Sequence, residues 1–301
     1  MPLDYEKAMS LAILGQRVSY SDRELMLYAY AVGMGADPMD EKELQFVNED
    51  AYPARALKVL PTFATVLSYG TTGMGRLDYN RAMEVDGERD LMIHRPFPLP
   101  AEVSGLFCAG DRRPSVDLRV DSSVIGVEDK GKDKGAVIRV KTVFKSGGEP
   151  LATLLSSYFC RGDGGFGGAT ESRAKPHPIP SRAPDKTIDI SIRPDQALVF
   201  RLCGDRNPTH ADPGYARLAG FPRPILHGLC TYGISCRGVL QTYADFDVNA
   251  IKRHAARFSA PVYPGETVTL DLWKDADVIS FEARAKARNV TVLKHGMTVL
   301  G

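Results

Sequence analysis

The 301-residue sequence lacks features that mark several large classes of protein. Its five cysteines are odd in number and form no CxxC pair, which argues against a disulfide framework and a structural zinc site. The six histidines show no HExxH motif or other metal-ligand spacing, so we predict no metal. No apolar run is long enough to span a bilayer, and neither end carries a recognisable address signal. We therefore expect a cytoplasmic protein without a membrane anchor.

An excess of charge of one sign is missing as well. The chain has 38 basic and 37 acidic residues, for a net charge of +1. No basic stripe indicates nucleic acid, and no acidic tail indicates a basic partner. Hydrophobic residues make up 44% of the chain. At this chain length, that fraction suffices for a sizeable core in one or two domains.

Three weak similarities recur in the same order in the two halves of the chain, which predicts an internal duplication. The matching pairs are YAVGMGADP (30–38) with FRLCGDRNP (200–208), PTFATVLSYG (61–70) with PILHGLCTYG (224–233), and FPLPAEV (97–103) with VYPGETV (262–268). Each half also repeats the same order of elements: a helix, a loop, a mostly apolar helix and a group of strand-like runs.

The predicted fold class is therefore α+β, with two units that each wrap an antiparallel sheet around a long central helix. The N-terminal unit spans 1–160 and the C-terminal unit 186–301, and a Gly- and Pro-rich linker, 161–185, joins them. The first helix starts at the capping box SDRE, and the central helices are expected at 62–70 and 228–244. Strand-like runs cover 115–128, 136–145, 150–160, 256–262, 266–277, 278–287 and 290–300.

The linker contains a glycine cluster, GDGGFGG (162–168), that could be taken for a phosphate-binding loop. No GK[ST] follows it, and no strand–loop–helix pattern surrounds it. The sequence therefore favours a linker over a phosphate site.

The polar stretch GDRNPTH places Asp205, Asn207 and His210 within six positions. A simple turn would also explain these residues, because Gly, Asp, Asn and Pro form turns readily. The aligned positions of the first copy carry different side chains, however, and keep only the proline and the preceding aromatic residue. Since a turn required by the fold should be present in both copies, this difference favours a functional site in the second copy.

Gly228 opens the second central helix in HGLCTYG, shortly after this stretch. The first N–H groups of a helix lack intrahelical partners and carry positive dipole character, and glycine lets a ligand approach the backbone closely. These properties predict an oxyanion hole at Gly228. For the neighbouring His227, a packed or helix-capping imidazole is favoured over a catalytic role.

The whole stretch 200–233 resembles the signature of the MaoC-like hydratases. More narrowly, it resembles the double hot-dog (R)-specific 2-enoyl-CoA hydratases, known as hydratase 2. PTF (61–63), EDKGKDKGAVI (128–138) and RFSAPVYPGE (257–266) extend the likeness over most of the chain. The resemblance implies that water adds to trans-2-enoyl-CoA to give (3R)-3-hydroxyacyl-CoA, in fatty-acid oxidation or a related pathway. It implies no metal or redox cofactor, because CoA is part of the substrate.

The resemblance also implies a role for each residue of the motif. Asp205 and His210 together orient and activate the water and manage the proton at C2. Asn207 holds the water or the aspartate, and the Gly228 N–H stabilises the enolate-like thioester oxygen. Acid and base roles are not divided between Asp205 and His210, since the pair can titrate as a unit.

For the CoA moiety the resemblance points to Lys130, which a solvated hairpin tip would also explain, and to Phe258, which core packing would also explain. A substrate-contacting His-Gly pair of the family corresponds here to Asp86 and Gly87, so the acyl preference is open. An acyl-CoA partner and a homodimer are implied, as is a peroxisomal location if the protein is eukaryotic.

Three other functions stay open from the sequence. The first is a dehydratase acting on carrier-protein-bound, sterol-side-chain or branched acyl thioesters. The second is a thioesterase, because hot-dog folds host both reactions. The third is a non-catalytic acyl-thioester-binding protein, against which the complete polar motif argues.

Overall fold

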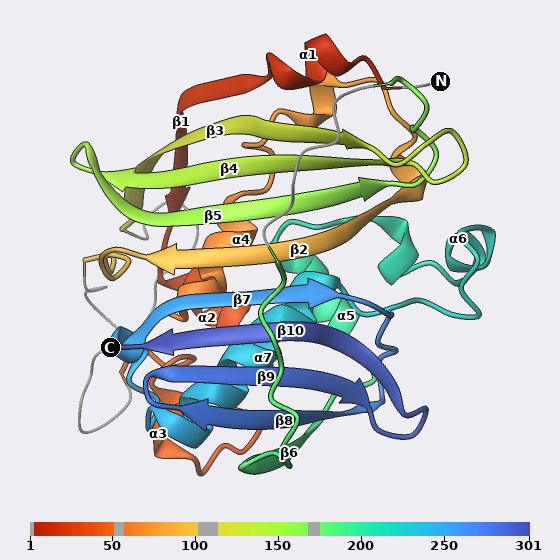
Figure 1. The fold of residues 1–301 in the computed structure, drawn as a ribbon. Helices are drawn as coiled ribbons and strands as arrows, with labels where there is room; N and C mark the ends of the chain where they lie inside the picture. The colour runs from red at the N-terminus through yellow and green to blue at the C-terminus, as the bar shows by residue number, and fades with distance from the viewer. Residues whose placement is uncertain (1–2, 51–56, 102–113, 168–174) are drawn as a thin grey trace.

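The computed structural model describes residues 3–50, 57–101, 114–167 and 175–301. In this part of the chain, ten strands form one antiparallel sheet in the order β1-β3-β4-β5-β2-β7-β10-β9-β8-β6 (Figure 1). The order in the second half, β6-β8-β9-β10-β7, repeats that of the first half, β1-β3-β4-β5-β2. This repeated topology is what an internal duplication of an α+β unit produces.

The two halves meet where β2 pairs with β7. The strands of the N-terminal half are β1 (Ala12–Tyr20), β2 (Glu84–Ile93), β3 (Val116–Asp129), β4 (Ala136–Ser146) and β5 (Glu149–Cys160). Those of the C-terminal half are β6 (Lys186–Ser191), β7 (Ile251–Phe258), β8 (Thr267–Asp275), β9 (Val278–Ala285) and β10 (Val290–Leu300). The predicted division into units 1–160 and 186–301 stays a prediction, and the two groups of strands fall within these ranges.

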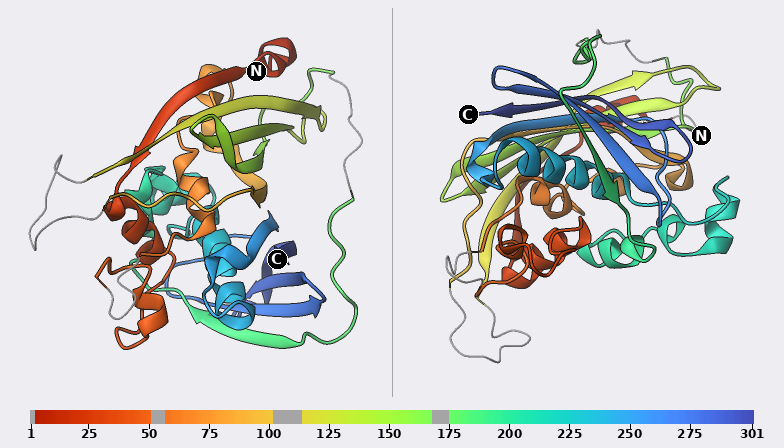
Figure 2. Two further views of the ribbon diagram at one scale, coloured as in Figure 1. Left: turned by 90° about the vertical axis from the view of Figure 1, so that its left-hand side faces the viewer. Right: turned by 90° about the horizontal axis from the view of Figure 1, so that it is seen from below.

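The helices gather on one face of the sheet (Figures 1 and 2). The α-helices are α1 (Tyr5–Met9), α2 (Asp22–Ala31), α3 (Glu41–Leu44), α4 (Ala64–Leu67), α5 (Gln196–Phe200), α6 (Pro213–Leu218) and α7 (Gly228–Tyr243). The 3-10 turns are η1 (Pro61–Phe63), η2 (Met74–Arg76), η3 (Arg81–Met83), η5 (Arg201–Cys203), η6 (Pro208–His210) and η7 (Val248–Ala250). Within the described ranges, none of these helices is long and apolar enough to cross a membrane.

The long central helix of the C-terminal unit is confirmed as α7, which crosses the sheet face formed by β6 to β10 (Figure 2). Its large apolar side chains, Leu229, Ile234, Val239 and Leu240, are buried in the main core. Burial of each such side chain stabilises the fold by about 1.5–3 kcal/mol. Gly238 lets the helix approach the sheet, because a Cβ there would lie 2.6 Å from Leu270 Cδ2.

The prediction of a long central helix over 62–70 in the N-terminal unit is wrong. Between residues 61 and 67 the chain forms only η1 and α4. The Thr65, Ser68 and Thr71 hydroxyls each donate to the carbonyl oxygen three residues earlier, at 2.7–2.8 Å. Such side-chain bonds compete with continued helix formation. Gly70, at φ +73°, then turns the chain away.

Two predicted helix starts are confirmed, those of α2 and α7, and a third helix also begins at a capping residue. The capping box holds the start of α2, because the Ser21 N–H donates to Glu24 Oε2 at 2.8 Å and the Ser21 side chain caps the helix. Asp212 caps α6, with Pro213 as its first residue. The helix α7 begins at Gly228, as the sequence predicts.

Seven predicted strand-like runs are found as strands, whereas β1, β2 and β6 were missed. Strand β7 also begins five residues before its predicted start at 256. The edge strand β1 exposes most of its residues and has an irregular register between Ile13 and Gln16. Strand β2 carries charged side chains in its middle, so neither strand shows the alternation of polar and apolar residues on which strand prediction depends.

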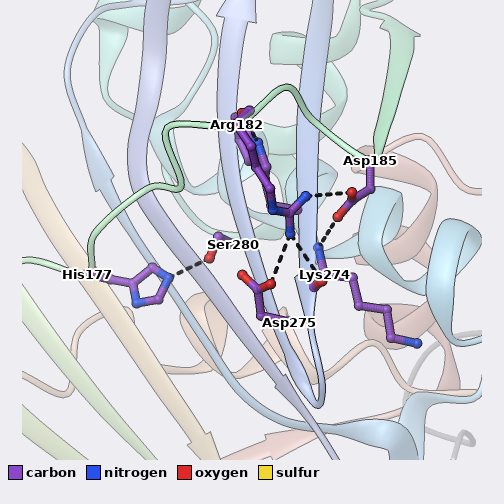
Figure 3. A network of polar contacts seen from close by, with 7 residues as sticks. His177, Arg182, Asp185, Lys274, Asp275 and Ser280 are labelled. Carbon is purple, nitrogen blue, oxygen red and sulfur yellow. Dashed lines mark hydrogen bonds and ion pairs between the residues drawn. The ribbon is translucent and has the colours of Figure 1, made fainter.

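The described part of the predicted linker, residues 175–185, crosses the sheet on the face opposite α7 (Figure 1). Figure 3 shows its contacts with β8 and β9. His177 Nε2 lies 2.7 Å from Ser280 Oγ, and Arg182 donates to Asp185 and Asp275 at 2.5 and 3.0 Å. This end of the linker is therefore held in place, and residues 168–174 lie outside the described chain.

The glycine cluster binds a carboxylate of the same chain. The N–H groups of Gly165, Gly167 and Gly131 donate to Asp129 at 2.8, 2.7 and 2.8 Å. These bonds, the one from Gly165 most strongly, hold the pKa of Asp129 below its usual range. Because the backbone donors already have an acceptor, a phosphate loop is not supported; Gly168, the last predicted glycine, lies outside the described residues.

Candidate active site

A cavity of about 1090 Å³ is lined by both units. The C-terminal unit contributes the loop 204–210, the start of α7 and the end of β7. The N-terminal unit contributes residues after α4 and the first half of β2. This volume suits a ligand of at least drug size, for which pockets of roughly 300–1,000 Å³ are usual.

The GDRNPTH loop curls around Pro208, and its own hydrogen bonds hold it. The Asn207 N–H donates to Asp205 Oδ1 at 3.0 Å, and Asn207 Oδ1 accepts from the Thr209 N–H at 3.0 Å. Asn207 thus positions Asp205 through its backbone and caps the turn η6 through its side chain. The predicted water-holding role of its amide is a separate expectation that this geometry does not require.

The loop brings Asp205 and His210 together, as predicted. A carboxylate oxygen of Asp205 and a ring nitrogen of His210 lie within 4.8 Å of each other. His210 Nδ1 lies 2.9 Å from the Ile225 carbonyl oxygen. Because a carbonyl only accepts hydrogen bonds, Nδ1 carries a proton, and in the neutral ring the lone pair is on Nε2. The site therefore holds two groups able to accept a proton.

The ring of His227 packs against that of His210. His227 is buried, its ring stacks on that of His210 at 3.7 Å between centroids, and its Nε2 lies 3.2 Å from the Asp205 carbonyl oxygen. Burial, followed by the neighbouring His210, lowers the pKa of His227 to about 2, so the ring is neutral. Of the two alternatives from the sequence, this geometry agrees with the packed imidazole. His227 is the N-cap residue of α7, but its side chain makes no capping hydrogen bond.

Asp205, His210 and His227 offer three potential metal-ligand atoms within 4.8 Å of one another. The two imidazole rings are stacked, with centroids 3.7 Å and planes 28° apart, so their in-plane lone pairs lie in two separate, nearly parallel planes. A zinc ion needs nitrogen lone pairs that converge on one point at about 2.0–2.1 Å. The arrangement suits proton transfer better than metal binding, and the absence of a metal stays a prediction.

Three residues that the sequence predicted for the site, Asp86, Gly228 and Phe258, lie close together. A Cβ on Gly228 would lie 3.2 Å from Asp86 Oδ2 and 3.3 Å from the Phe258 ring. Its N–H belongs to the first turn of α7, where no acceptor exists within the helix. The structure thus places a backbone donor, an aromatic ring and a carboxylate together on the cavity wall.

Asp86 and Gly87 occupy a bulge of β2, where the register with β5 shifts. Asp86 forms an ion pair with Arg89, whose side chain is only 3% exposed. Gly87 is required by close packing, since a Cβ there would lie 2.5 Å from Ser157 Oγ. Arg89 was not predicted as a site residue, because strand β2, in which it lies, was itself not recognised from the sequence.

Lys130 lies in the hairpin between β3 and β4 and also lines the cavity, next to Lys134. It forms an ion pair with Glu128. Lys130 therefore fits both hypotheses from the sequence, the hairpin tip and the CoA contact, because it lies in a hairpin turn that lines the cavity.

Tyr69, just after α4, was not predicted as a site residue. Its ring lies 3.0 Å from the position of a Cβ on Gly204, and both residues line the cavity. Its hydroxyl is buried and has no hydrogen-bond partner in the described part of the chain. Burial first, and then the charges of Asp205 and Asp86, raise the pKa of Tyr69 well above its usual value, so the hydroxyl stays protonated.

Comparison with known proteins places this geometry in a family. Residues 176–296 match the family described as MaoC like domain, and residues 18–162 match the MFE-2 hydratase 2 N-terminal domain. Enoyl-CoA hydratase ChsH3 of Mycobacterium tuberculosis is 35% identical over 100% of this chain and 99% of its own length. The chain belongs to the MaoC-like hydratase 2 family.

Other members of the MaoC-like hydratase 2 family agree over similar lengths. A peroxisomal enoyl-CoA hydratase 2 of Arabidopsis thaliana is 33% identical over 95% of this chain and 92% of its own. The crystal structure of a MaoC-like dehydratase from Phytophthora capsici superposes with a TM-score of 0.82 at 29% identity, covering 99% and 98% of the two chains. The predicted family, the α+β double hot-dog fold and the hydro-lyase class are confirmed. The roles of single residues stay predictions.

Proposed function

We propose that this MaoC-like hydratase 2 adds water across trans-2-enoyl-CoA to give (3R)-3-hydroxyacyl-CoA. One observation carries the proposal: Asp205 and His210 lie within 4.8 Å of each other in the cavity that also receives the first residue of α7. A proton-accepting pair beside a backbone N–H donor is the equipment that hydration of a conjugated thioester requires.

The proton-accepting pair handles both protons of the reaction. As the water oxygen bonds to C3, one water proton passes to the pair and the C2–C3 π electrons move toward the thioester oxygen. When these electrons return to form the C2–H bond, the pair gives one proton to C2 of the substrate. His210 Nε2 and the Asp205 carboxylate can each accept the first proton, because Nδ1 of His210 is committed to Ile225. Asp205 itself is held by the Asn207 N–H. The pair acts as a unit, so neither residue is assigned the acid or the base role alone.

The Gly228 N–H stabilises the negative charge that develops on the thioester oxygen. The aligned peptide dipoles of α7 add positive potential at the same point. A donor of this kind typically contributes about 2.7–4 kcal/mol to transition-state stabilisation. Phe258 and Asp86, which flank Gly228, then bound the space for the thioester and the adjoining part of the substrate.

The rim of the cavity suits the phosphates of CoA. Lys130 and Lys134 line it from the β3–β4 hairpin, and Arg81 and Arg161 line it from neighbouring segments. Four cationic side chains in the lining favour an anionic ligand. No separate cofactor is proposed, since CoA enters as part of the substrate.

The assembly and location follow as finer parts of the proposal. The family resemblance supports a homodimer. The cytoplasm is the proposed location, and the names of peroxisomal relatives support the peroxisome as its alternative.

The test compares the wild type with Asp205→Asn on trans-2-enoyl-CoA, followed by the loss of conjugated thioester absorbance. We expect turnover by the wild type, a (3R) product on chiral analysis, and a rate lower by about 10²–10⁴-fold in the variant. A folded wild type that is inert on short, long and branched enoyl-CoAs would contradict the proposal. Release of free CoA thiol would identify a thioesterase instead.

A further inference from the structure

A second cavity, of about 910 Å³, lies beside the active-site cavity. Its wall is built mostly by the N-terminal unit, from β1, α2 and the short helical segment η1–α4. The apolar residues that line it include Val18, Tyr20, Met26, Leu27, Phe63, Val66 and Leu67. A hollow of this composition suits an alkyl chain better than a polar group.

Tyr69 and Arg206 line both cavities and so form the boundary between them. Arg206 is exposed, whereas Tyr69 is half-buried and supplies the inner part of the boundary. The Tyr69 ring lies against Gly204, next to the catalytic Asp205. Any group that passes from the reacting atoms toward the apolar cavity therefore meets this ring.

The surroundings of Tyr69 differ from those of its counterpart in the second unit. Tyr232, the tyrosine of the matching Tyr-Gly pair, donates its hydroxyl to the His254 carbonyl oxygen. The Tyr69 hydroxyl is buried without such a partner in the residues that the structure describes. Among these residues, no hydrogen bond of the hydroxyl therefore holds Tyr69, and what distinguishes it is the position of its ring between the two cavities.

We propose that Tyr69 determines the acyl-chain specificity of the enzyme. Its ring closes the catalytic cavity on the side of the apolar cavity, so a short acyl group fits beside Asp205 and a long chain is excluded from the space beyond. Removal of the ring joins the two cavities and admits the longer chain. This inference rests on the proposed hydratase function.

The experiment measures kcat/KM for crotonyl-CoA and for trans-2-dodecenoyl-CoA and compares the long-to-short ratio among variants. In Tyr69→Ala we expect this ratio to rise roughly tenfold or more, because each methylene newly admitted to an apolar pocket favours the long substrate. In Tyr69→Phe we expect the wild-type ratio, because the ring remains. Leu27 also lines the apolar cavity, so adding Leu27→Trp to Tyr69→Ala fills part of that cavity, and we expect the ratio to fall back.

Each outcome decides the proposal. A folded, active Tyr69→Ala with the wild-type ratio overturns it, and so does a double variant that keeps the raised ratio, since the chain then lies elsewhere. A Tyr69→Phe ratio as high as that of Tyr69→Ala also overturns it, because the hydroxyl would then be the determinant. If Tyr69→Ala does not fold, Tyr69→Val tests the same opening by a smaller rise.

Failure of the proposed function has a different signature. A wild type inert on both substrates overturns the hydratase proposal together with this one. A wild type active on crotonyl-CoA, with unchanged ratios in the variants, overturns the role of Tyr69 alone.

Discussion

The two units of this protein share one strand order and differ in the helix that the strands enclose. In the C-terminal unit the 16-residue α7 fills this place, and its first residue is the proposed oxyanion donor. In the N-terminal unit only η1 and α4 are present, and the second cavity lies against them. The comparison teaches that two units with one strand order can differ in their central helix, and that a cavity lies beside the shorter helical segment.

The largest expected effect tests whether chemistry resides in one unit only. His210→Ala removes a proton acceptor of the pair, and we expect kcat to fall by about 10²–10⁴-fold. The aligned residue of the first unit, Asp40, caps α3 through the Lys42 and Glu43 N–H groups. Asp40→Ala is therefore expected to leave kcat unchanged and to lower the free energy of unfolding by about 1 kcal/mol. Steady-state kinetics and urea unfolding of both variants check this, and comparable losses of kcat would break the contrast between the units.

A smaller effect is expected from two glycines of α7. In Gly228→Ala the new methyl group crowds Asp86 Oδ2 and the Phe258 ring, which displaces the substrate-binding groups. We expect kcat/KM to fall roughly tenfold to a hundredfold with little change in stability. Gly238→Ala serves as the matched control: its methyl group meets Leu270, so the free energy of unfolding should fall by about 1–3 kcal/mol with kcat/KM maintained. The reverse pattern would remove Gly228 from the active site.

The smallest effect concerns the pH dependence of stability, for which the C-terminal unit should be the sensitive one. Burial lowers the pKa of His254 to about 3 and that of His227 to about 2, against 6.5 for an exposed histidine. The unfolded chain therefore binds a proton at each histidine below about pH 6.5, whereas the folded chain does not until the folded pKa is reached. The stability contributed by the neutral histidines is fully present above pH 6.5. As the pH falls below 6.5, each of the two histidines lowers the free energy of unfolding by about 1.4 kcal/mol per pH unit.

His254→Gln tests this slope directly. Glutamine can still bond to Ser235 and Thr298, the present partners of the imidazole. We expect the plot of unfolding free energy against pH between 6 and 4 to become less steep by about 1.4 kcal/mol per pH unit. Equal slopes for the wild type and this variant would contradict the prediction.

Much of the fold could be predicted from the sequence where local pattern and environment agree. Strands such as β4 and β8 alternate or run apolar because they are covered by the core, and capping residues such as Ser21 and Asp212 act within one turn. The short N-terminal helix could not be predicted from apolar spacing, because side-chain hydroxyls compete for its carbonyl groups.

The residues of the candidate site also fall into those that could be predicted from the sequence and those that could not. The loop with Asp205 and His210 is local in sequence, so comparison of the two copies could find it. Arg89 and Tyr69 lie on segments whose meeting with that loop depends on the pairing of the two halves. Tyr69 also belongs to a Tyr-Gly pair that is present in both copies. By the criterion that a functional residue is present in one copy only, Tyr69 was not selected as a site residue.

The pairing of β2 with β7 has a mechanical consequence for turnover. Backbone hydrogen bonds run between these strands, and Arg253 and Arg257 of β7 form ion pairs with Asp90 and Glu88 of β2. The same two strands carry Asp86 and Phe258 to either side of Gly228. A hinge between the units would have to break this ladder, so the pairing holds Asp86 and Phe258 at a fixed separation. Substrate exchange by a hinge between β2 and β7 would therefore be costly, and the part of the site wall that these strands form is built to stay rigid during turnover.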